Sequence, residues 1–284
     1  MRKLLRADFL RIKKSKSFWG GLVVLAGFAL GIFFDFYRRV PRVYTTISLP
    51  EVLAECLFQH MILAGIVFSV FCSLFTGTEY EEGTIRNKLV TGQSRTSIYL
   101  SNYICCMTVS IFQAAVSVLL TLAVGTVLCG KPYMPAEQFL WLFVILLFLC
   151  MAYASIYNLC GMLISSKSHA SMANVLLAVA FIVLASYLVM KLGQPETVPQ
   201  VSITGDTITY GEEIPNPGYV KGIQREIYQF LTDFLPGGQS YQISTSSLQN
   251  QILRHPALSC CYSAIIIIAA NLTGIFVFRR KDIK

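Results

Sequence analysis

Six stretches of this chain are apolar and long enough to cross a lipid bilayer, and they constrain the fold more than any other feature. They lie at about residues 18–36, 52–76, 98–129, 139–164, 172–190 and 257–278. Each exceeds the roughly 17 residues that an α-helix needs to cross about 30 Å of hydrocarbon. Only a helix satisfies its own backbone hydrogen bonds within one lipid-exposed segment. We therefore expect an all-α integral membrane protein in which residues 1–284 form a single transmembrane domain.

The composition supports the same fold class. The chain is 55% hydrophobic and only 13% charged, whereas a soluble domain of 284 residues needs more polar surface. A basic segment precedes the first apolar stretch, as in a secretory signal. That stretch is too long for a signal, however, and it ends in Phe33-Phe34-Asp35-Phe36-Tyr37 without a small-residue cleavage site. We therefore expect it to be the first transmembrane helix.

Lys and Arg residues are distributed unequally between the two sides of the expected bundle. With the N-terminus inside, fifteen lie on the cytoplasmic side and eight outside, and the cluster of Arg38, Arg39 and Arg42 is the exception. The positive-inside rule therefore predicts a multi-pass protein of the plasma membrane with both termini cytoplasmic. The net charge of +8 fits this topology and contact with anionic lipid better than it fits binding to nucleic acid.

Residues 1–17 predict an amphipathic helix before the first span. Leu5, Phe9 and Ile12 recur at i, i+4 and i+7, and basic residues surround them. Such a helix lies in the inner membrane interface with its apolar side towards lipid. The alternative is a basic tail that only fixes the topology.

The nine cysteines predict no special chemistry. Eight lie inside the expected spans and Cys129 lies at a span end, without a disulfide framework or the spacing of a zinc site. We expect them to be small buried side chains. We also predict no catalytic, metal-binding or cofactor-binding residue in this chain.

The connector after the second span, residues 77–97, is the most distinctive polar segment. Thr78 stands three residues before Glu81, as in a capping box, and Ile85 and Leu89 then share one helical face. Gly92 offers a stop before the third span. The pattern predicts a short cytoplasmic helix with acidic residues in front and basic residues behind, an order that the helix dipole also favours for structural reasons alone.

The order of these elements resembles the permease subunits of type 2 ABC exporters. It consists of a basic interfacial helix, two spans, the run Glu79-Tyr80-Glu81-Glu82-Gly83-Thr84-Ile85-Arg86-Asn87-Lys88-Leu89, then Ser94-Arg95 and four more spans. The resemblance covers nearly the whole chain and is specific at residues 79–95. It implies a prokaryotic permease that pairs with a second permease copy and with two separate ATPase subunits. Related permeases export antimicrobial peptides, drugs, lipids or ions.

In that family the connector is a coupling helix that lies in a groove of the ATPase, next to the N-terminal interface helix. The resemblance assigns this contact to Glu79, Glu81, Glu82, Gly83, Thr84, Arg86 and Lys88. This chain has no Gly-x-x-x-x-Gly-Lys-Ser/Thr run, so ATP and magnesium are expected in the partner ATPase. The chain itself is not expected to be an enzyme.

The outer segment of residues 191–256 predicts two small elements. Residues 201–204 and 207–210 alternate apolar and polar side chains around Gly205-Asp206, which is typical of a β-hairpin. An amphipathic helix follows, ended by Pro236-Gly237-Gly238. Its apolar face is formed by Ile223, Ile227, Phe230, Leu231 and Phe234.

Two other functions are open. An ion-driven carrier or channel normally has charged residues in mid-span or helices broken by proline, and no proline lies inside the six spans. Glu81-Glu82-Gly83-Thr84-Ile85-Arg86 also matches a motif of intramembrane metalloproteases. The later residues His169 and His255 are expected on opposite sides of the membrane, however, which disfavours a shared metal site. No residue can be assigned to the substrate path.

Overall fold

The computed structural model describes residues 1–43, 48–204, 207–245 and 256–282, and most of them are helical. Six helical segments among these residues are long and apolar enough to cross a membrane, which confirms the expected fold class and number of spans. The segments are α2 (Lys16–Val43), α3 with α4 (Leu49–Cys56 and Met61–Glu81), α6 (Arg95–Cys129), α7 (Ala136–Leu163), α8 (Lys167–Leu192) and α11 (Pro256–Arg280).

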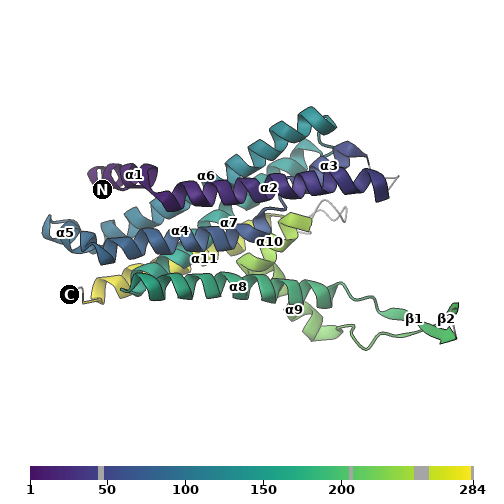
Figure 1. The fold of residues 1–284 in the computed structure, drawn as a ribbon. Coiled ribbons are helices and arrows are strands. Elements are labelled where there is room, and N and C mark those ends of the chain that lie inside the picture. The colour runs from purple at the N-terminus through teal and green to yellow at the C-terminus, as the bar shows by residue number, and fades with distance from the viewer. Residues whose placement is uncertain (44–47, 205–206, 246–255, 283–284) are drawn as a thin grey trace.

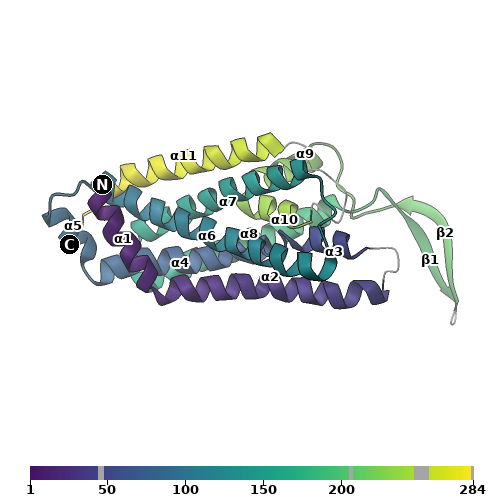
Figure 2. The same cartoon turned by 90° about the horizontal axis from the view of Figure 1, so that it is seen from above.

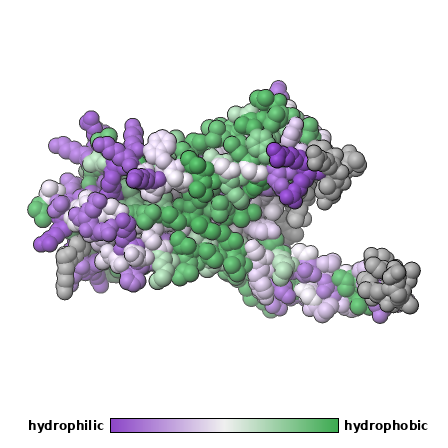
Figure 3. Space-filling model, in the orientation of Figure 1, coloured by the Kyte–Doolittle hydropathy of each residue, from purple (hydrophilic) through white to green (hydrophobic). Residues whose placement is uncertain are grey.

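The long helices run side by side and give the bundle two different ends (Figures 1 and 2). Both termini lie at one end with the short helices α1 (Arg2–Lys14) and α5 (Thr84–Val90), and we call it the terminal end. The opposite, hairpin end carries strands β1 (Thr197–Thr204) and β2 (Thr207–Pro215). Hydrophobic residues form a band between the ends, and hydrophilic residues gather at the terminal end (Figure 3). This banding is what a bilayer requires.

The second expected span is broken. Helix α3 ends at Cys56 and α4 begins at Met61, with turn residues between them. The backbone N–H of Ser48 donates to the Glu51 carboxylate at 2.8 Å, so a capping box starts α3. The break consists of Leu57, Phe58, Gln59 and His60, which are all buried. Two polar residues among apolar neighbours do not end the apolar segment, so hydropathy averaged along the span does not reveal the break.

The connector at the terminal end begins later than expected. Helix α4 continues through Glu81, and Gly83 then adopts a left-handed conformation with φ 67° before α5 starts at Thr84. The predicted capping box of Thr78 and Glu81 is therefore wrong, because both residues belong to the last turn of α4. That turn persists because Glu79 points inward to charged partners.

The elements at the hairpin end are largely as predicted. β1 and β2 pair antiparallel with Val201 opposite Tyr210 and Thr204 opposite Thr207, which confirms the hairpin and extends both strands. Helix α9 (Gly222–Phe234) confirms the amphipathic helix. The turn residues Gly205-Asp206 and residues 246–255 of the outer segment lie outside the described residues.

Helix α9 ends at Phe234, just before Pro236-Gly237-Gly238 as predicted. The same three residues also begin a further helix that the sequence did not predict, α10 (Pro236–Thr245), whose first turn is buried. Proline suits the first turn of a helix, which needs no donor there. A Cβ at Gly237 would collide with the carbonyl of Phe181 on α8, and one at Gly238 with the carbonyl of Thr232 on α9. The two glycines therefore let α10 pack closely against its neighbours.

One main core fills the space between α2, α4, α6 and α7 and includes Leu25, Phe68, Cys106 and Tyr153. All nine cysteines are free thiols, and six of them are buried, close to the expectation. Cys261 differs because its side chain is exposed on α11.

Candidate functional site: a buried charge network at the terminal end

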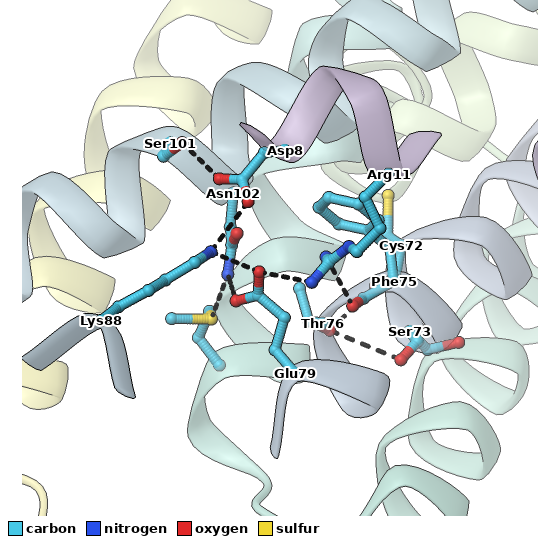
Figure 4. Close-up of polar contacts among 11 residues, drawn as sticks. Asp8, Arg11, Cys72, Ser73, Phe75, Thr76, Glu79, Lys88, Ser101 and Asn102 are labelled. Atoms are coloured by element: carbon cyan, nitrogen blue, oxygen red, sulfur yellow. Dashed lines mark hydrogen bonds and ion pairs between the residues drawn. The ribbon is translucent and has the colours of Figure 1, made fainter. Parts of the chain in front are cut away.

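Four charged side chains from three helices meet at the terminal end (Figure 4). Lys88 of α5 places its Nζ 2.9 Å from Oδ1 of Asp8 on α1 and 2.5 Å from Oε1 of Glu79 on α4. Arg11, one turn after Asp8 on α1, donates to the same Glu79 oxygen at 2.7 Å. Asp8 and Glu79 therefore share the Lys88 cation, and Glu79 also pairs with a second cation, Arg11. We call these residues the charge network.

The charge network is largely removed from solvent. Glu79 is 0% exposed, Asp8 3% and Lys88 9%, while Arg11 is partly exposed. Two carboxylates face two cations, so the cluster is electrically balanced. Buried charges are tolerated when each is paired and hydrogen-bonded, and removal of one partner leaves an uncompensated charge. The network is thus strongly constrained in composition and geometry.

Neutral groups on α6 complete the hydrogen bonding of both acids. The Ser101 hydroxyl donates to Oδ2 of Asp8 at 2.7 Å, and the Asn102 amide donates to Oε2 of Glu79 at 2.8 Å. All four carboxylate oxygens therefore have a donor. Because Ser101 and Asn102 are neighbours on α6, this helix holds the α1 acid and the α4 acid at once.

Arg11 is fixed by contacts with α4 besides its ion pair. Its guanidinium donates to the Phe75 carbonyl at 3.2 Å and lies 3.9 Å from the centre of the Phe75 ring. A planar cation that stacks on a ring and donates in its own plane has little rotational freedom. Arg11 therefore sets the position of α1 along α4.

Local sequence explains why these side chains point inward. Leu4, Asp8 and Ile12 recur every four residues of α1 and form its buried face. On α5, Ile85 and Lys88 are three residues apart and are both buried. Ile85 packs with Leu4 in a small apolar cluster beside the charges. An apolar pair and an ion pair thus join the same two helices.

The other face of α5 is open. Arg86, Asn87 and Val90 of α5 are exposed, Val90 at 81%, and so is Glu82 in the turn between α4 and α5. Gly83 and Thr84 are half-buried, and the exposed Glu81 pairs with Lys167 of α8 at 2.8 Å. The seven residues assigned to an ATPase contact therefore differ in direction. Glu79 and Lys88 are directed into the bundle, Glu82 and Arg86 face outward, and Glu81, Gly83 and Thr84 lie between them.

The predicted apolar face of α1 is also turned towards protein. Ile12 is buried in the main core, and Leu5 and Phe9 are partly buried against it. Leu10 is exposed on the other side of the helix. The residues that most fully face the bundle are Leu4, Asp8 and Ile12, which differ in part from the expected set.

Sequence reasoning did not single out Asp8, Ser101 or Asn102. Asp8 carried a usable signal, because it is the only acid before Asp35 and it falls on the apolar face of an otherwise basic helix. An acid in that position needs a cation from elsewhere in the fold. Ser101 and Asn102 carried no such signal, since amides and hydroxyls are common at contacts between membrane helices.

The chain end after α11 is held beside the charge network. Lys281 donates to the Tyr80 hydroxyl at 2.9 Å and to the Met162 carbonyl at 3.0 Å. Arg95, at the start of α6, donates to the carbonyls of Phe278 and Lys281. Burial lowers the pKa of Lys281 to about 8. These contacts join the end of α11 to α4, α6 and α7.

The arrangement is suited to holding helices in fixed relation. Among the residues that the structure describes, no group of three or more His, Cys, Asp or Glu side chains is placed to hold a metal ion. Every charged group of the network is engaged with another part of the chain. Its physical effect is to bind α1, α4, α5 and α6 into one unit with an exposed face on α5.

Comparison with known proteins agrees with this architecture. No curated protein matches the sequence. Residues 4–186 match the family described as ABC-2 family transporter protein. The match spans more than half of the 284 residues and includes α1 from Leu4 onward, α5 and the whole charge network. The chain therefore belongs to the ABC-2 transporter family and is a multi-pass membrane permease of an ABC transporter.

Proposed function

We propose that this permease is the membrane-spanning half of an ATP-driven exporter and that the exposed face of α5 docks on its ATPase subunit. The observation that carries the proposal is that α5 is buried on one side and exposed on the other. One side is anchored through Ile85 and Lys88, while Glu82, Arg86 and Val90 project from the end of the bundle. A short helix held firmly on one side and free on the other is suited to contact a second protein.

The proposed orientation places the terminal end in the cytoplasm, where ATP is available. Fifteen Lys and Arg residues lie in the segments expected on this side of the membrane, against eight in the segments expected on the other side. The basic residues of α1 and of the chain end would then face anionic lipid headgroups. We place the protein in a prokaryotic plasma membrane with both termini cytoplasmic.

The proposed cycle uses two permease copies with two ATPase subunits. Closure of the ATPase subunits around ATP and magnesium would displace α5, and the bundle would alternate between two packings that expose the substrate path to either side. An antimicrobial peptide, drug, lipid or ion is the expected kind of substrate. The alternative is a carrier or channel driven by an ion gradient, which would need no ATPase.

Copurification tests the docking surface. Tagged permease is extracted in mild detergent as wild type, as the outward-face variant Glu82→Lys with Arg86→Glu, and as the control Gln224→Lys on exposed α9. We expect an ATP-hydrolysing subunit to copurify with wild type and with the control but not with the outward-face variant. Recovery of the subunit with all three forms would exclude this face as the docking surface. Recovery with none would favour the ion-driven carrier.

A further inference from the structure

The chain connections of α5 differ from those of α1. Helix α5 follows α4 after two residues and is joined to α6 by residues 91–94. Movement of α5 therefore pulls directly on α4 and α6. Helix α1 lacks any such connection to α5, and the only element that follows it directly is α2, after the single residue Ser15. Movement of α5 reaches α1 and α2 only through noncovalent contacts.

The charge network supplies such a contact between α1 and α5. Lys88 Nζ lies 2.9 Å from the Asp8 carboxylate, with both side chains at least nine-tenths buried. Beside them, Leu4 of α1 packs in one apolar cluster with Ile85 of α5. Separation of the two helices would expose this cluster and leave the buried Asp8 carboxylate without its cation. The two helices therefore favour moving together.

The joint between α1 and α2 is braced across Ser15. The Trp19 indole of α2 donates to the Lys13 carbonyl of α1 at 3.0 Å, and the hydroxyls of Ser15 and Ser17 lie 2.7 Å apart. Phe18, at the start of α2, is buried in the main core and packs edge-on against Trp19 at 5.0 Å between ring centres. A hinge of one residue with hydrogen bonds on both sides transmits a tilt of α1 to α2.

We propose that Lys88 is a positioning residue that makes α1 and α5 one rigid body, so that a displacement of α5 is delivered to α2 through α1 and the Trp19 brace. The route would run from Lys88 to Asp8, along α1, and across Ser15 to the first transmembrane helix. It adds to the direct packing of α2 against α4 and α6, the two helices that the chain connections already join to α5. The inference rests on the proposed docking of α5 only for the source of the displacement.

Spin-label distances test this rigid body. Nitroxides are attached through unnatural amino acids at the exposed positions Ala7 on α1 and Thr91 at the end of α5, so that the native cysteines remain. Distances are measured in the complex with its ATPase, without nucleotide and after trapping with ADP and vanadate. In wild type we expect one narrow distance that trapping leaves unchanged. A change of several ångströms in wild type would overturn the proposal.

A variant and a matched control separate the charge contact from general stability. Asp8→Asn with Lys88→Met removes the α1–α5 ion pair without leaving either partner as an unpaired charge. We expect its Ala7–Thr91 distance to broaden and to change on trapping, with the ATPase still bound. Arg6→Met, which removes an exposed charge on α1 outside the charge network and outside the α5 docking face, is expected to keep the wild-type distance. A narrow, unchanging distance in the double variant would also overturn the proposal.

The outcome separates this inference from the proposed function. If no ATPase copurifies with the wild-type permease, the result counts against the proposed function alone. The Ala7–Thr91 distance of the isolated permease would then decide the inference, since the network is expected to keep that distribution narrow in wild type and not in the double variant. A label at exposed Val24 on α2 tests the Trp19 brace. We expect the Ala7–Val24 distance to stay unchanged on trapping in wild type and to change in Trp19→Phe.

Discussion

The terminal end and the hairpin end of the bundle are held together by different kinds of contact. At the terminal end, Asp8, Glu79 and Lys88 are buried charges that satisfy each other. At the hairpin end, α10 is fixed by neutral groups: Ser263 donates to the Gln239 side chain at 2.7 Å, and the hydroxyls of Tyr153 and Ser240 lie 2.8 Å apart. Both sets are buried, but only the first becomes strongly unfavourable when a single partner leaves.

This difference separates a rigid end from an adaptable one. A balanced group of buried charges has one favourable arrangement, so the helices that carry it keep their relative positions. Neutral hydrogen bonds in a membrane are worth less and find other partners more easily. Helix α10 relies instead on the close approach allowed by Gly237 and Gly238. We therefore expect substitutions at the terminal end to have the larger effects.

The largest effect is expected from Lys88→Met. It leaves the Asp8 and Glu79 carboxylates in the bundle without their shared cation, and loss of one member of a buried pair costs about 3–5 kcal/mol. The thermal inactivation temperature in detergent should fall markedly, with partial recovery when Asp8→Asn is added. Arg86→Met is the matched control and should stay within about 0.5 kcal/mol of wild type. Equal behaviour of the two single variants would contradict the network's role.

A smaller loss is expected from Gly238→Ala at the hairpin end. The added methyl group meets the carbonyl of Thr232, so α10 must shift, and overpacking of this kind costs about 1–3 kcal/mol. Gly20→Ala on α2 is the control, since a Cβ there has open space around it. Thermal inactivation of the two variants should therefore differ clearly. A Gly238→Ala protein as stable as the control would show that α10 adapts without strain.

Ser263→Ala should have a still smaller effect. It removes the donor to Gln239 Oε1 and costs about 1 kcal/mol. Gln239 keeps its own bonds to the carbonyls of Asp233 and Ser259, so α10 should remain in place. The same thermal measurement applies. A loss as large as that of Lys88→Met would remove the proposed difference between the two ends.

The smallest effect concerns pH at the chain end. Burial lowers the pKa of Lys281 from 10.5 to about 8, so between these values the unfolded chain binds more protons than the folded one. Stability must therefore rise as pH increases through this window, and Lys281 contributes part of the rise. We expect thermal stability to increase from pH 7.5 to 9.5 more steeply in wild type than in Lys281→Met. Identical slopes would show that Lys281 is solvated.

Hydropathy and periodicity were sufficient to predict the spans, the hairpin and α9. Each of these elements is determined by the pattern of apolar and polar residues within its own segment, so it can be predicted without knowing which other helices pack against it. The break between α3 and α4 and the course of α10 were missed because contacts from other helices determine them. Pro236-Gly237-Gly238 is a common helix stop, and α9 does end just before it, but close packing on α8 and α9 also makes it the start of α10.

The charge network was predictable only in part. The run from Glu79 to Lys88 stood out as polar and led to the correct segment, but sequence could not show which side chains turn inward. The inward direction of Lys88 follows from Asp8, which lies 80 residues away in the chain. Asp8, the lone acid on the apolar face of α1, was overlooked as a sign that a cation must lie beside it. The identity of that cation depends on the fold.

Site-specific photocrosslinking tests the central claim most directly. A photoreactive amino acid is placed at Val90 on the exposed face of α5 or at Tyr133, which is exposed near the hairpin end, and native membranes are irradiated. The account predicts a covalent adduct between permease and an ATP-hydrolysing subunit from position 90 and none from position 133. An ATPase adduct from position 133, or no ATPase adduct from position 90, would contradict docking on α5.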